Sequence, residues 1–424
     1  MKTPRLPLSL FAALSAGFLF AAPVFGGDAA NAQKPEEPRP IAIPLERVIE
    51  LEEIRSHEPG NGASLPPVPM AFDGNASDLK ATVVVPTLDT PIENGKNAIW
   101  CASIPLLWKY AENNLQKGPL TLEGNPPEVA RLNDAHDPTK DIRPEDFYVN
   151  AGFVRDGIKD CIHSTMSDRF PAVRIPDFFK ADKPDAIIGY AYMKATVKGK
   201  VPYVRQHIGW STSDGKGKQP QFYSFGVLGW TLMQDLRDEP SILYVSWDVL
   251  CNGHAGDAAI LLGSNNGRDR IVVAFMDHKA SLAKMLASVK RKILWGYSPF
   301  HIRKFRFEDS LNIPTLNWNI VRHCTELENR TVQNGTLSGK TITEALQQIT
   351  FTVDETGAIP ESVAQFITYT DAGGNYARQF DFNRPFLLYM TKPGASEPYF
   401  VMWVANTELL TVDKEATAAA GTAK

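Results

Sequence analysis

The stretch that decides the fold is FNRPFLLYMTKPGASEPYFVMWVAN, residues Phe382–Asn406. It contains two apolar runs, Pro385–Met390 and Tyr399–Val404, that are rich in aromatic and β-branched residues, which favour strands. Lys392-Pro393-Gly394 lies between the runs, and a Pro-Gly pair is typical of a turn. The sequence therefore predicts a buried antiparallel hairpin near the carboxyl end of the chain.

Upstream of this hairpin the sequence predicts helices first and strands later. Residues 97–117 predict a helix from about Ser103, because Pro105 would lie in its tolerant first turn. The clearest helix is 281–293, where apolar residues recur at helical spacing and Asp277 or Ser281 could cap the amino end. This order predicts an α+β fold with a helix-rich N-terminal part and mixed or antiparallel sheets. The other predicted strands are 82–85, 187–197, 242–247, 258–262, 271–276, 301–307 and 349–353.

The composition is that of an ordinary globular protein. The chain has 424 residues, of which 43% are hydrophobic, and a net charge of −4. That charge gives no basic surface for nucleic acid, so we expect no nucleic-acid partner. No internal repeat is visible, and we expect one folded domain over residues 81–412.

The N-terminus predicts export. Lys2 and Arg5 precede an apolar run from about Leu6 to Val24, and small residues follow up to Ala32. This is the pattern of a secretory signal, here residues 1–32, although the run is almost long enough for an uncleaved membrane anchor. We expect a secreted, periplasmic or cell-envelope protein with no membrane span after cleavage. Residues 33–80 predict a linker rich in proline and glutamate, and residues 413–424 predict a disordered tail.

Several segments resemble the serpin family of serine protease inhibitors, in the order that the family has them. The hairpin segment is similar to the closing strand pair of serpins, and Phe305–Asn312 and Ile349–Gly357 resemble a conserved upstream segment and the hinge strand (V-N-E-x-G). Weaker similarities occur at Asn97–Trp100, at Tyr190–Lys194, and in the order of strands 258–262 and 271–276 before the helix at 281. The chain thus resembles a divergent, secreted, bacterial-type serpin between about Asn97 and Asn406. The resemblance implies a protein that binds proteases and has no enzymatic activity.

The resemblance also implies a reactive loop and hinge, with departures that bear on inhibition. In inhibitory serpins the loop inserts as a new central strand, and small residues at alternate positions allow this. Here Pro360 removes a hydrogen-bond donor from that strand, and Glu361 adds a charge that needs a solvated face. We therefore predict that the hinge is defective for insertion. Counts from either side place the scissile position between Asp371 and Gly374. The residues implied for the hinge and loop are Glu355, Gly357, Ala358, Pro360, Glu361, Asp371, Ala372, Gly373 and Gly374.

No other motif predicts catalysis, a cofactor or a metal site. Cys251-Asn252-Gly253-His254, with Asp257 nearby, has residue types suited to a thiol nucleophile, but such groups normally come from distant segments. The cluster of Asp134, His136, Asp137 and Asp141 lacks the ligand spacing of a calcium loop, so we interpret it as a solvated turn. The four cysteines, Cys101, Cys161, Cys251 and Cys324, allow three pairings, and free thiols are an equal alternative.

Three functions stay open at this stage. The first is an exported serpin-like protein that binds a protease or another extracellular protein. The second is a non-inhibitory secreted or envelope-associated binding protein. The third is a hydrolase whose catalytic residues the sequence does not disclose.

Overall fold

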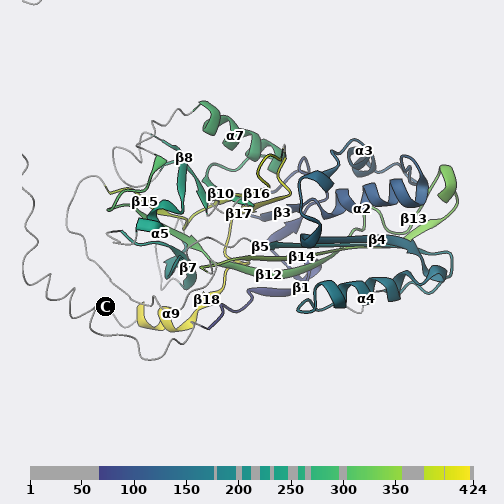
Figure 1. Cartoon of the computed structure of the whole chain (residues 1–424), viewed down its shortest axis with the longest axis horizontal. Coiled ribbons are helices and arrows are strands. Elements are labelled where there is room, and N and C mark those ends of the chain that lie inside the picture. The colour runs from purple at the N-terminus through teal and green to yellow at the C-terminus, as the bar shows by residue number, and fades with distance from the viewer. Residues whose placement is uncertain are drawn as a thin grey trace, which may run out of the picture. The chain divides into compact units, whose positions relative to one another are not determined.

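The computed structural model describes residues 66–175, 179–196, 203–211, 220–229, 234–246, 256–262, 269–295, 303–355, 377–395 and 397–420. All of them lie in the compact unit that runs from Asn61 to Lys424. They form three β-sheets with helices packed against them (Figure 1), which confirms the predicted α+β class. None of the helices in these ranges is long and apolar enough to cross a membrane.

The first sheet is built around its longest strand, β14 (Thr341–Val353). β14 runs parallel to one neighbour and antiparallel to the other. All residues from 344 to 349 are buried, which is the pattern of a strand covered on both faces. Helices α2 (Ser103–Ala111) and α3 (Pro127–Asn133) pack on one face, and α4 (Ile158–Arg169) packs on the other (Figure 1). The strand order is β1 (Phe72–Asn75), β12 (Leu316–His323), β14, β5 (Ile187–Thr196) and β4 (Phe147–Phe153), and β13 (Arg330–Thr331) also pairs with β14.

The second sheet contains the predicted hairpin. β16 (Phe386–Thr391) and β17 (Phe400–Val404) pair antiparallel, and the Phe386 side chain is 0% exposed, so this prediction is confirmed. Helix α7 (Leu282–Trp295) contacts this sheet at β17, and the Ser281 hydroxyl accepts from the Lys284 amide at its amino end. The strand order is β2 (Thr82–Val84), β3 (Asn97–Cys101), β17, β16, β10 (Arg270–Phe275), β9 (Ala258–Leu262) and β8 (Ser241–Val245).

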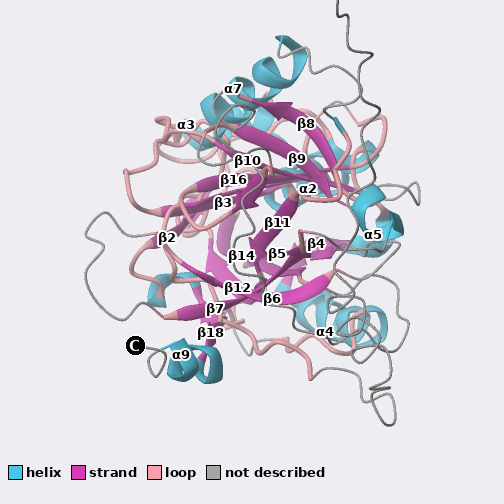
Figure 2. Cartoon of the chain, turned by 90° about the vertical axis from the view of Figure 1, so that its left-hand side faces the viewer, coloured by secondary structure: helices cyan, strands magenta, loops and turns pink. Residues whose placement is uncertain are grey.

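The third sheet lies beside the carboxyl end of β14. Its central strand β7 (Gln221–Val227) passes so close to β11 (Ser310–Pro314) that a Cβ at Gly226 would lie 1.8 Å from the Leu311 carbonyl oxygen. Only glycine fits there. The strand order is β15 (Gln379–Asp381), β11, β7 and β18 (Val412–Asp413), and β6 (Val204–Gly209) also pairs with β7. The short helix α9 (Lys414–Ala420) lies beside β18 and β7 of this sheet (Figure 2), and another short helix, α5 (Gln234–Asp238), precedes β8 of the second sheet in the chain.

Three segment predictions were wrong where the structure describes them. The predicted linker is not irregular throughout, because β1 pairs in parallel with β12 just after the last proline of the segment, Pro69. In the predicted disordered tail, Asp413 ends β18 and Lys414–Ala420 form α9, since the alanines favour a helix and Asp413 caps it. The predicted strand at 301–307 has no strand among its described residues, and the Asp309 carboxylate, which accepts from the Arg306 amide, closes a turn there instead.

Candidate functional site

The predicted hinge begins at the carboxyl end of β14, where the chain leaves the first sheet. Glu355, the one predicted site residue that the structure describes, is 7% exposed. Its Oε1 accepts from Arg205 Nε on β6 at 2.6 Å and also from the Nη2 of the same guanidinium. Its backbone carbonyl accepts from the Tyr203 amide at 3.0 Å. The first and third sheets are therefore joined at the last described residue before the predicted loop.

A second buried ion pair holds the chain where it returns. Arg378 and Asp309 are 1% and 0% exposed. Arg378 Nε donates to the two Asp309 carboxylate oxygens at 3.0 and 3.1 Å, and its backbone amide donates to Oδ1 at 3.0 Å. The Lys304 carbonyl accepts from the same guanidinium at 2.8 Å. β15 then begins at Gln379 and pairs in parallel with β11. Residues 356–377 are therefore flanked on each side by an arginine–carboxylate pair, half-buried at Arg205–Glu355 and fully buried at Arg378–Asp309.

β14 and β5 meet along a long parallel seam inside the first sheet. The two strands pair in parallel from Ile342 opposite Ile187 to Thr352 opposite Thr196. On one face, the Tyr190 hydroxyl donates to Gln348 Oε1 across the seam at 2.7 Å. Gln348 Nε2 in turn donates to Asn319 Oδ1 on β12 at 3.1 Å. A buried polar row thus links three strands, and separating them would leave these groups without partners.

The segment that follows α4 crosses this seam and bonds directly to β14. Glu344 Oε1 accepts from the backbone amides of Lys180 at 2.7 Å and Ala181 at 3.1 Å. Gln348 Nε2 also donates to the Arg174 carbonyl at 3.1 Å. The segment packs on the same face of the first sheet as α4, against residues of both β5 and β14. We call the described parts of this segment, residues 170–175 and 179–186, the strap.

On the opposite face, β14 bonds to the start of α2. Gln347 Nε2 donates to Ser103 Oγ at 2.8 Å, and the Cys101 thiol lies 2.7 Å from the same oxygen. Burial raises the pKa of the Cys101 thiol, and burial raises the pKa of Cys324 to about 12. Cys101, Cys161 and Cys324 are free, and both buried thiols therefore stay protonated at neutral pH, a state unsuited to nucleophilic attack.

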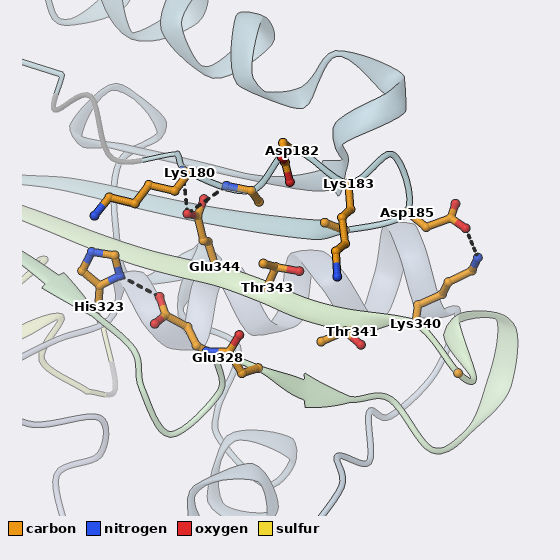
Figure 3. A pocket seen from close by; sticks show the side chains of 14 residues that line it. Lys180, Asp182, Lys183, Asp185, His323, Glu328, Lys340, Thr341, Thr343 and Glu344 are labelled. Atoms are coloured by element: carbon orange, nitrogen blue, oxygen red, sulfur yellow. Dashed lines mark hydrogen bonds and ion pairs between the residues drawn. The ribbon is translucent and has the colours of Figure 1, made fainter.

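A cavity of about 610 Å³ opens between the strap and the amino end of β14 (Figure 3). Its carboxylates serve structural contacts. Glu344 holds the strap, Glu328 Oε1 lies 2.9 Å from His323 Nδ1 and accepts from the Ala345 amide, and Asp185 pairs with Lys340 at 2.9 Å. The cavity has the volume of a small-molecule site, but three of its four carboxylates, those of Asp185, Glu328 and Glu344, already have partners within the fold.

The remaining predicted site residues divide into two groups. Gly357, Ala358, Pro360, Glu361, Asp371, Ala372, Gly373 and Gly374 lie outside the described residues, as do Cys251 and His254. Asp257 pairs with Lys292, and His136 Nε2 lies 2.8 Å from Asp141 Oδ2 in a turn where Asp137 accepts from the Thr139 amide. In the part of the chain that the structure describes, no group of three or more histidine, cysteine, aspartate or glutamate residues is arranged to hold a metal.

Sequence reasoning missed the two arginines and the aspartate that anchor the loop. No motif in the sequence marks Arg205 or Arg378, and Asp309 lies within the serpin-like segment Phe305–Asn312 without a predicted role. The available signal is that Arg378 stands at alternate positions with Phe380 and Phe382, two core residues in the run Arg378-Gln379-Phe380-Asp381-Phe382.

No protein-family model matches the sequence, and no curated protein matches it. Among solved structures, the chain is similar to tengpin, a thermophilic serpin, with 11% identity over 75% of this chain and 90% of that chain and a TM-score of 0.47. It is also similar to human kallistatin, with 12% identity over 74% and 92% of the two chains and a TM-score of 0.45. A third similar structure is serpin-12 of Manduca sexta, with 12% identity over 74% and 93% and a TM-score of 0.41. β14 is the strand that precedes the predicted loop.

Proposed function

We propose that this protein is an exported, serpin-like binding protein that presents residues 356–377 to a protease without inserting them into its own sheet. The observation that carries the proposal is the closed seam: β14 is paired along both edges and is bonded to Tyr190, to Asn319 and to the strap. An inserted strand would have to break these contacts. Pro360 and Glu361 lie where that strand would begin, so it would gain fewer ladder bonds in return.

The anchors support presentation of the loop. Buried arginine–carboxylate pairs fix geometry at a cost in desolvation, and removing one partner leaves an uncompensated charge. The pairs at Glu355 and Arg378 fix the two ends of residues 356–377 on the third sheet. A segment fixed at both ends offers its middle to a partner with a smaller loss of entropy than a free chain.

The composition of the loop indicates which proteases to test. Residues 356–377 contain no lysine or arginine but include Phe366, Tyr369 and Tyr376. A protease with an aromatic or apolar primary specificity therefore finds sites in the loop, whereas a trypsin-like protease finds none.

The experiment is to incubate the protein with chymotrypsin and with trypsin. It follows cleavage within residues 356–377 and the formation of a protease complex that survives denaturing electrophoresis. Chymotrypsin is expected to cut within residues 356–377 and to release the nicked protein, with no complex that survives denaturing electrophoresis. A covalent complex would show an inhibitor and overturn the proposal. Resistance of the loop to chymotrypsin would instead favour the second candidate, a non-inhibitory binding protein whose partner is not a protease.

Export belongs to the same proposal and has its own test. Residues 1–32 carry the charged, apolar and small-residue pattern of a secretory signal. The intact mass of protein purified from its native host is expected to correspond to a chain that begins near Gln33. A cytoplasmic chain that still begins at Met1 would contradict export and leave the proposal for the loop untouched.

A further inference from the structure

The C-terminal segment is attached to the third sheet by backbone and side-chain bonds. We define Thr411–Ala420, which comprises β18 and α9, as the clasp. β18 pairs antiparallel with β7, and the Thr411 carbonyl accepts from the Tyr223 amide at 3.0 Å. Thr417 Oγ1 accepts from the Gln221 amide at 2.9 Å. The clasp therefore covers the end of the sheet at which β7 begins.

Asp413 is the centre of this attachment. It is 4% exposed, and its Oδ1 accepts from the Ala416 amide at 3.0 Å, which caps α9. Its Oδ2 lies 3.1 Å from Nδ1 of His207 on β6. The Tyr223 hydroxyl also bonds to Asp413, and burial together with this carboxylate raises the pKa of Tyr223.

The same residues lead from the clasp to the hinge. His207 lies directly opposite Tyr223 in the register of β6 and β7, and Arg205 is two residues earlier on the same face of β6. The Arg205 guanidinium lies 5.9 Å from the centre of the Tyr223 ring, within the range of a cation–π contact. Arg205 then bonds to Glu355. Asp413, Tyr223, Arg205 and Glu355 thus form a continuous chain of contacts from the clasp to the end of β14.

We propose that the clasp is a positioning device for the hinge: through Asp413 and Tyr223 it holds Arg205 against Glu355, and its release loosens the end of β14. In this arrangement the C-terminal clasp stabilises the contact between Arg205 and Glu355, although Glu355 lies more than fifty residues before Asp413. A partner that displaced the clasp would free the base of residues 356–377. This inference rests on the proposed function only in treating that segment as the binding loop.

The test is hydrogen exchange of the full chain, followed in peptides that cover residues 349–355. Arg205→Ala removes the hinge contact directly and is expected to raise exchange there. Asp413→Ala is expected to raise it at least tenfold, the effect of losing one or two buried hydrogen bonds. Lys414→Ala, a neighbouring exposed side chain, is the matched control and is expected to leave exchange at the wild-type rate.

A double variant separates coupling from general destabilisation. If the clasp acts through Arg205, Asp413→Ala added to Arg205→Ala raises exchange at the hinge no further. Asp413→Asn keeps the shape of the side chain and an acceptor for the cap, so it provides a folded variant if Asp413→Ala is unstable, and it is also expected to raise exchange. Wild-type exchange in both Asp413 variants, while Arg205→Ala exchanges faster, would overturn the inference. No protease enters this experiment, so its failure is distinct from failure of the proposed function.

Discussion

Tyr190 on β5 and Gln348 on β14 are joined by a hydrogen bond of 2.7 Å across the seam of the first sheet. Tyr190 is 1% exposed and Gln348 is 0% exposed, so water cannot replace either partner while the sheet is closed. Burial raises the pKa of the Tyr190 hydroxyl well above its ordinary value of 10, and the hydroxyl therefore stays a donor at any physiological pH. The seam is therefore held closed by a side-chain hydrogen bond as well as by the backbone hydrogen bonds between β14 and β5.

Tyr190→Phe should destabilise the protein by about 1–3 kcal/mol, because it leaves the buried Gln348 oxygen without its donor. Chemical denaturation measures the loss. Tyr110→Phe is the matched control, since it removes a half-buried hydroxyl that bonds to Asn150 away from the seam, and it should cost less. Equal losses in the two variants would contradict a special contribution of the seam.

Phe386→Ala should cost about 3–5 kcal/mol, because the ring is fully buried in the second sheet and a cavity would remain. The Phe386 ring also packs edge-on against Phe382, with ring centres 5.3 Å apart. A denaturant titration measures the change. A loss below about 1 kcal/mol would mean that the site collapses around the smaller side chain.

Arg378→Met should cost about 3–5 kcal/mol, because it leaves the Asp309 carboxylate buried and unpaired. Replacing both residues, with Asp309→Leu added to Arg378→Met, should recover part of that loss, since no charge is then left without a partner. Lys340→Met breaks the exposed pair with Asp185 and is the control, expected to cost less than about 1 kcal/mol. If Arg378→Met is as stable as the wild type, the ion pair between Arg378 and Asp309 does not stabilise this end of the loop.

The thiols should separate into reactive and protected classes. In a Cys251→Ser background, Ellman's reagent at pH 8 should react quickly with Cys161, which is exposed, and not with Cys101 or Cys324, which are buried. Burial raises the pKa of Cys324 to about 12, so little thiolate forms at pH 8 even where the reagent reaches it. Guanidinium chloride should expose the remaining two. Fast reaction of more than one thiol in the native protein would contradict this placement.

The sequence predicted elements whose apolar pattern is complete within one segment. The β16–β17 hairpin and α7 are of this kind. It missed β7 and β12, where Ser224, Gly226 and Asn319 interrupt the apolar pattern. These residues are accepted because of partners far away in the sequence: Gly226 because β11 passes close by, and Asn319 because Gln348 donates to it.

The candidate site also depends on partners that are distant in the sequence. Glu355 was predicted because a family resemblance marks the hinge, whereas Arg205 lies 150 residues before it and carries no local signal. Asp309 and Arg378 are 69 residues apart, and each alone looks like a surface residue. A buried ion pair is a property of two positions together, and a single sequence shows only each position by itself.

The effect of loop cleavage on stability distinguishes a protein that only binds a protease from an inhibitor that inserts its cut loop. In an inhibitory serpin, insertion of the cut loop adds a full strand to the central sheet and raises the melting temperature. Here β14 already pairs with β5 over its length, the strap bonds to β14 at Glu344, and Pro360 would remove a ladder donor at the start of a new strand. We expect chymotrypsin cleavage within residues 356–377 to leave the melting temperature nearly unchanged in differential scanning calorimetry. A large rise would show that the loop inserts and would restore the inhibitor interpretation.

Pro360→Ala combined with Glu361→Ala tests the cause of the block. If the hinge sequence alone blocks insertion, the cleaved double variant should show a rise in melting temperature. If the seam and the strap also block it, the rise should appear only when Glu344→Ala is added, because that change releases the strap from β14. A rise in cleaved Glu344→Ala protein with Pro360 and Glu361 intact would assign the block to the strap and not to the hinge.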